Sequence, residues 1–249
     1  VSDEDQGPRR LRRAEAVLAR RTSRVVLVLE KTWNDENVDA VLRTAESFGV
    51  QHVWTVRHPH GRRAQSRVTK GSHAWLTERV FDESAQLIEA LQADGYAIWA
   101  TDLSPEAQVL DTSDVMRPVP DRVALVFGRE VDGVSETFLA AADRRFYLPM
   151  QGFTESLNLS VATALVLQRL FDADPTLVGA MPESERAALR AKWYARLGGT
   201  DERKRHRYAS EVNDPPPPLD DLRPADEFRA PRFKKRAHWR HSDSGTAES

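Results

Sequence analysis

The sequence contains no cysteine. That absence excludes disulfide bonds, thiol catalysis, and zinc or iron–sulfur sites with cysteine ligands, and it is typical of proteins of the reducing cytoplasm. No apolar run approaches the length of a transmembrane span, and no charged and then apolar leader is visible. We therefore expect a cytoplasmic protein with no membrane contact. Its 249 residues can form one large domain or two small ones.

Several signatures of nucleotide binding and hydrolysis are also missing. No G-x-G-x-x-G follows a strand, which argues against a dinucleotide dehydrogenase, and no G-x-S-x-G is present, which argues against an α/β hydrolase. The stretch FGREVDGVSE, residues 127–136, has P-loop glycine spacing but carries Val134 where a P-loop has lysine. Glu130 and Asp132 would repel phosphate. This loop therefore suits a neutral or cationic ligand, or is only a tight strand-to-helix turn.

The net charge of −2 is unevenly distributed along the chain. Residues 1–24 carry +3, residues 25–199 carry −6 and residues 200–241 carry +3. Residues 57–75 contain five Lys or Arg and three His without an acidic residue. Basic ends and a basic loop on an acidic body indicate contacts with a polyanion such as RNA, although solvated segments would have the same composition.

Short apolar runs rich in β-branched residues alternate with segments of helical periodicity. This alternation predicts an α/β fold, in which a mostly parallel sheet carries helices on both faces. The expected strands are residues 24–30, 52–56, 78–81, 96–101, 122–128 and 144–150. The expected helices cover residues 34–48, 83–93 and 157–171, and another begins at Ser135.

Changes in composition divide the chain into four parts. Residues 1–22 form a basic N-terminal helical arm, and residues 23–172 form the α/β domain. Residues 173–200 are expected to add a C-terminal helical extension. The tetraproline segment and the charged residues after it predict a Pro-rich, basic, disordered tail over residues 201–249.

Three polar positions next to these elements each have an ordinary structural explanation. Arg43 lies at ion-pair spacing from Asp39 and Glu46 on its predicted helix. Ser156 and Asn158 stand where the helix 157–171 begins, and both residue types cap helices. Taken one at a time, these explanations would be sufficient.

Taken together, the motifs resemble the TrmH family of ribose 2′-O-methyltransferases, within the SPOUT class of RNA methyltransferases. Asn37, Arg43 and the following TAESFGV are similar to the first family motif, and LVFGREVDGVSE is similar to the second. LPMQGFTESLNLSVATAL is similar to the third, and KGSHAWL and ATDLS also match. Order and spacing agree over roughly residues 10–172.

The resemblance implies a SPOUT fold with a deep C-terminal trefoil knot, a homodimer, and S-adenosylmethionine as the cofactor, with no metal. An acidic loop suits the sulfonium cation of that cofactor. The implied catalytic residues are Arg43, Asn37, Glu130, Ser156 and Asn158. The implied cofactor contacts lie near Thr101, Leu103, Gly128, Leu148, Met150 and Leu157.

The RNA surface is expected on the first helix and on the basic loop. Its candidate residues are Arg9, Arg10, Arg12, Arg13, Arg57, Arg62, Arg63, Arg67 and Lys70. Short family members with such terminal helices are similar to the branch that methylates the D-loop guanosine at tRNA position 18. NDEN stands where that branch has Lys-Pro-His before the motif Asn, and GFTESLN replaces GMVQSLN. An rRNA ribose methyltransferase and a non-catalytic RNA-binding protein on this fold therefore stay as alternatives.

Overall fold

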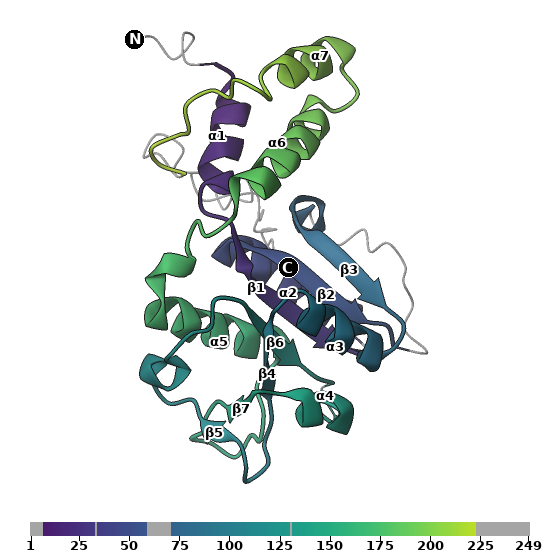
Figure 1. The fold of residues 1–249 in the computed structure, drawn as a ribbon, viewed down its shortest axis with the longest axis vertical. Coiled ribbons are helices and arrows are strands. Elements are labelled where there is room, and N and C mark those ends of the chain that lie inside the picture. The colour runs from purple at the N-terminus through teal and green to yellow at the C-terminus, as the bar shows by residue number, and fades with distance from the viewer. Residues whose placement is uncertain (1–6, 33, 59–70, 130, 223–249) are drawn as a thin grey trace, which may run out of the picture.

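The computed structural model describes residues 7–32, 34–58, 71–129 and 131–222. Its centre is a seven-stranded sheet in the order β3-β2-β1-β6-β4-β7-β5, and every neighbouring pair runs parallel (Figure 1). The strands are β1 (Thr22–Glu30), β2 (Val50–Val56), β3 (Thr77–Phe81), β4 (Ala97–Thr101), β5 (Gln108–Val109), β6 (Val123–Phe127) and β7 (Arg144–Tyr147). All are confirmed predictions except β5, which is too short to leave a pattern in the sequence.

Helices cover both faces of the sheet, as predicted. In β1, Val25, Leu27 and Leu29 face one core, whereas Val26 and Val28 face the other, because successive side chains of a strand alternate. Helices α2 (Asp35–Phe48) and α5 (Leu159–Ala173) pack on the first face. Helices α3 (Ser84–Ala93) and α4 (Glu136–Ala141) pack on the second. Short 3₁₀ turns occupy Ser72–Trp75, Ser113–Met116 and Pro175–Leu177.

The local sequence sets both ends of α2. The side chain of Asn34 accepts a hydrogen bond from the backbone N–H of Glu36 at 2.8 Å, which caps the helix start. Gly49 ends the helix with φ of +77°, and a Cβ at this position would lie 2.7 Å from the carbonyl oxygen of Arg20. Only glycine satisfies both constraints without strain.

A separate helical unit lies beyond the amino end of β1 (Figure 1). It consists of α1 (Arg9–Leu18), α6 (Glu183–Gly198) and α7 (Glu202–Ser210) around a third apolar core. Inside it, Arg190 donates to both carboxylate oxygens of Glu15 at 2.9 and 3.0 Å, and the hydroxyl of Tyr194 donates to the same carboxylate at 2.8 Å. Burial, reinforced by that carboxylate, raises the pKa of Tyr194.

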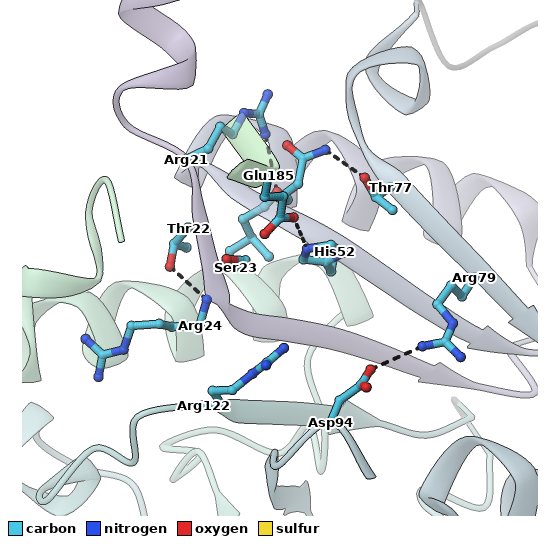
Figure 2. Close-up of polar contacts among 12 residues, drawn as sticks. Arg21, Thr22, Ser23, Arg24, His52, Thr77, Arg79, Asp94, Arg122 and Glu185 are labelled. Atoms are coloured by element: carbon cyan, nitrogen blue, oxygen red, sulfur yellow. Dashed lines mark hydrogen bonds and ion pairs between the residues drawn. The ribbon is translucent and has the colours of Figure 1, made fainter. Parts of the chain in front are cut away.

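Buried polar groups join the helical unit to the sheet, and Figure 2 shows part of this junction. The fully buried guanidinium of Arg21 donates to Glu46 at 3.2 Å and lies 5.3 Å from the ring of Trp193 on α6. Burial lowers the pKa of Arg21, and the Glu46 carboxylate opposes that effect. His52 on β2 contacts the Glu185 carboxylate of α6 at 2.7 Å, which lowers the pKa of Glu185.

The predicted disordered tail is wrong for residues 201–222. Residues 202–210 form α7, and Tyr208 is buried in the third core. The Pro-rich segment then runs back along α1, where the amide of Leu219 donates to the carbonyl of Arg12 at 3.2 Å. Its prolines have no amide hydrogens to leave unpaired, so they can pack as an extended segment. None of the helices in residues 7–32, 34–58, 71–129 and 131–222 is long and apolar enough to cross a bilayer.

Candidate functional site

The carboxyl ends of four adjacent strands bring the three motifs to one edge of the sheet. Parallel pairing places Leu29 of β1 beside Phe127 of β6, and Thr101 of β4 beside Phe146 of β7. The loops that begin at Gly128 and Leu148 therefore leave the sheet on either side of the end of β4. Open parallel sheets bind ligands at this kind of edge, next to a reversal of strand order.

The loop after β6 is a narrow hairpin with no space at its base. Arg129 and Gly133 exchange two backbone hydrogen bonds of 3.0 Å, and Arg129 also pairs with Asp132. A Cβ on Gly128 would lie 2.0 Å from the carbonyl carbon of Gly133, so this position requires glycine. Glu130, the acidic residue of the second motif, lies outside the described residues.

A side-chain hydrogen bond joins the first motif to the third. The Nδ2 group of Asn158 donates to Oδ1 of Asn37 at 3.0 Å. Asn158 also caps α5, because its Oδ1 accepts the backbone N–H of Ser160 at 2.9 Å and its hydroxyl at 2.7 Å. The capping explanation of Asn158 is therefore confirmed, and the same side chain also reaches the helix that carries Arg43. Ser156 is exposed two residues before the cap.

Arg43 lies exposed on α2, the helix whose Asn37 contacts the cap of α5. The sequence offered it two acidic neighbours as ion-pair partners. One of these, Glu46, accepts a hydrogen bond from the buried Arg21 instead. The guanidinium of Arg43 is thus presented at the surface of α2, which packs against α5.

The expected cofactor positions differ in their exposure. Leu148, Met150 and Leu157 are half-buried in the loop between β7 and α5, whereas Leu103 is 70% exposed in the loop after β4. The hydroxyl of Thr101 donates to the Val126 carbonyl at 3.2 Å, which ties the ends of β4 and β6 together. These loops bring apolar side chains to one edge of the sheet.

The structure supports the exposure of only some of the residues predicted to contact RNA. Arg9, Arg10 and Arg13 are exposed on α1, but Arg12 is only 7% exposed, and its Nε donates to the Pro217 carbonyl at 3.2 Å. The assignment of Arg12 to RNA binding is therefore corrected, because the Pro-rich segment covers it. Arg57 is half-exposed and pairs with Asp82 at 2.9 Å. Outside the described residues lie Arg62, Arg63, Arg67 and Lys70.

Sequence reasoning missed two features. The first is Glu30, a carboxylate at the end of β1 that is 2% exposed beside the motif loops. Its only signal was one acidic residue that closes the apolar run VVLVL. The second is α7, on which five consecutive basic side chains are exposed: Arg203, Lys204, Arg205, His206 and Arg207.

Known proteins are similar to this chain in sequence and in fold. The model of the SpoU rRNA Methylase family matches residues 24–168, which is more than half of the chain. The chain therefore belongs to this family of methyltransferases, and its resemblance to the TrmH family is confirmed.

Among individual relatives, proteins named tRNA (guanosine(18)-2′-O)-methyltransferase are similar to this chain. The Borreliella burgdorferi protein is 33% identical over 187 residues, covering 74% of this chain and 84% of the relative. The Thermus thermophilus protein is 35% identical over 158 residues, covering 64% and 79%. The crystal structure of the Aquifex aeolicus TrmH/SpoU tRNA modifying enzyme covers 76% of this chain and 96% of its own, with a TM-score of 0.64 and 28% identity.

Proposed function

We propose that the protein uses S-adenosylmethionine to methylate a ribose 2′-hydroxyl of RNA, and that its substrate is the D-loop guanosine of tRNA. The observation that carries the proposal is the hydrogen bond between Asn37 and Asn158, which joins the first and third motifs at the sheet edge where the loop of the second motif begins. The names of the relatives at 33% and 35% identity support the choice of tRNA.

The residues at the sheet edge fit this cofactor, which would supply the methyl group from its sulfonium. Arg129 is paired with Asp132, so the hairpin offers a phosphate no unpaired cation. Gly128 has no side chain, so the backbone of Gly133 can lie against it and the hairpin can turn tightly at the end of β6. Leu148 and Met150 are half-buried and supply apolar surface for a nucleoside ring. The expected contacts at Thr101, Leu103 and Leu157 belong to the same proposal.

Arg43 is proposed to act on the nucleophile. A guanidinium offers five N–H donors and no acceptor, so Arg43 is better suited to binding and stabilising negative charge than to acting as a simple base. It can hold an RNA phosphate through two hydrogen bonds and stabilise the alkoxide that develops as the 2′-hydroxyl loses its proton. Asn37 and Asn158 would orient that region, and Glu130 and Ser156 would orient the nucleotide and the loops.

The RNA is proposed to contact the helical unit. Arg9, Arg10 and Arg13 are exposed on α1, and basic side chains are exposed on α7. Electrostatic contacts of this kind position RNA through its phosphates. Deleting residues 1–20, the simplest test, would also remove Leu11 and Leu18 from the third core. Point substitutions are therefore the better test.

Two finer features of the fold are part of the proposal. The first is a deep trefoil knot in the C-terminal part of the sheet domain. The second is a homodimer formed through α5, where Val161 is 46% and Leu165 is 42% exposed one turn apart. The opposite side of the helix, with Val166 and Leu167, is fully buried in the core. Light scattering should give a dimer for the wild type and a monomer for Leu165→Glu.

Two alternatives make different predictions about the products. An rRNA target is the first, since the family description names rRNA, and a non-catalytic RNA-binding protein is the second. Labelled S-adenosylmethionine, incubated with separate tRNA and rRNA pools, distinguishes all three. Label in tRNA alone supports the proposal, and label in rRNA alone supports the first alternative. RNA binding without label in either pool, or without cofactor binding, supports the second.

A further inference from the structure

Glu30 binds two hydroxyls and one backbone amide at the edge of the candidate site. Its Oε1 accepts the hydroxyls of Ser84 at 2.5 Å and Ser135 at 2.6 Å. Its Oε2 accepts the backbone N–H of Ser135 at 2.8 Å. The carboxylate is 2% exposed, and burying it is costly unless donors surround it. The three contacts meet that requirement.

The contact with Ser135 reaches the base of the second-motif hairpin. Ser135 follows Val134, which is 6% exposed and lies at the end of the hairpin formed between Arg129 and Gly133. The other end is fixed by β6 and by the close approach of Gly128 to Gly133. The hairpin thus has two anchors, one made by the sheet backbone and the other by the side chain of Glu30.

We infer that Glu30 is a positioning residue for methyl transfer. It holds Ser135, and through Ser135 it sets the direction of the hairpin that carries Gly128 at its base. The inference rests on the proposed function, because it assumes that this hairpin lines the cofactor site. Ser84, on the same carboxylate oxygen, begins α3 and leads away from the motif loops.

The two serines provide a matched pair of variants. Ser84→Ala and Ser135→Ala each remove one hydroxyl that donates to the same oxygen of Glu30. If Glu30 had only a structural role, the two variants would change stability and cofactor affinity to the same extent. We expect both to lower the melting temperature to a similar extent. Only Ser135→Ala should raise the dissociation constant and the KM for S-adenosylmethionine, by about tenfold or more, because a displacement of about 1 Å at a reacting site has large effects.

Substitution of Glu30 itself provides the second measurement. Glu30→Gln keeps one oxygen for the Ser135 amide, and its NH₂ group can donate to both serine hydroxyls, which can reorient. It should therefore retain cofactor affinity within about threefold, whereas Glu30→Ala should lose it along with stability. Equal cofactor affinities for Ser84→Ala and Ser135→Ala would overturn the inference. A wild-type protein that fails to bind S-adenosylmethionine would instead overturn the proposed function.

Discussion

Asn158 donates a hydrogen bond to Asn37 across 121 residues of sequence, at a distance of 3.0 Å. The bond connects the start of α2 to the start of α5, and Asn158 caps α5 with the same side chain. Asn158 therefore has two roles: it stabilises α5 as a cap, and it holds two motifs together. Substitutions can separate these roles.

Asn158→Ser should keep the helix cap but lose the reach to Asn37. Serine is nearly as good a cap as asparagine, so the free energy of unfolding should change little, whereas Asn158→Ala should lose about 1 kcal/mol. We expect both variants, and Asn37→Ala, to slow methyl transfer. Thermal unfolding and single-turnover methylation measure the two effects. A fully active Asn158→Ser would leave the residue with only a capping role.

Arg43→Ala should separate activity from stability. An ion pair at i,i+4 spacing on a helix surface contributes about 0.3–0.5 kcal/mol, so the melting temperature should barely move. Loss of the charge that favours the alkoxide should slow methyl transfer on the order of a hundredfold, with cofactor affinity unchanged. Ser47→Ala, one turn further along α2, is the control and should behave as wild type. If Arg43→Ala methylates RNA at a rate within about threefold of wild type, Arg43 has only the role of a surface ion-pair partner.

Gly128→Ala should destroy cofactor binding through a steric clash. The new Cβ would lie 2.0 Å from the backbone of Gly133, and relief of that overlap must displace the hairpin. We expect a loss of about 1–3 kcal/mol in unfolding free energy. Gly95→Ala is the control, because φ of +73° strains it by about 1–2 kcal/mol while no atom lies within 4 Å. Calorimetry with S-adenosylmethionine should detect binding to Gly95→Ala only.

The same substitution at Arg10 and at Arg12 should affect different properties: RNA binding for Arg10 and stability for Arg12. Arg10→Gln should flatten the slope of log affinity for tRNA against log salt by about 0.7–0.9, the value for one lost phosphate contact. Arg12→Gln should lower the melting temperature, because it removes the hydrogen bond to Pro217, and should leave the slope unchanged. Fluorescence anisotropy over a salt series measures both. Equal slopes for Arg10→Gln and wild type would place the RNA elsewhere.

The sheet could be predicted from sequence because its residues carry strong local patterns. Runs such as VVLVL are buried on both faces, and Asn34 and Gly49 mark the ends of α2. The ordered part of the tail could not be predicted in this way. Charge and proline dominate its composition, and its order depends on long-range contacts of Tyr208 and Leu219 with the helical unit.

The candidate site was only partly visible for the same reason. Motif order predicted roles for Asn37, Arg43 and Asn158, but the hydrogen bond between Asn37 and Asn158 is a property of the folded chain. The burial of Arg12 requires the Pro-rich segment to return along α1. Glu30 gains its importance from Ser84 and Ser135, each more than 50 residues away in sequence. The spacing of residues along the sequence does not show which distant residues come into contact in the folded chain.

Ribose methylation of a tRNA D-loop guanosine is tested most directly by nucleoside mass spectrometry of one tRNA transcript, after incubation with the protein and S-adenosylmethionine. We predict a single 2′-O-methylguanosine in the D-loop, absent when that guanosine is replaced by adenosine. A transcript that stays unmodified, while ribosomal RNA gains the methyl group under the same conditions, would contradict the tRNA assignment.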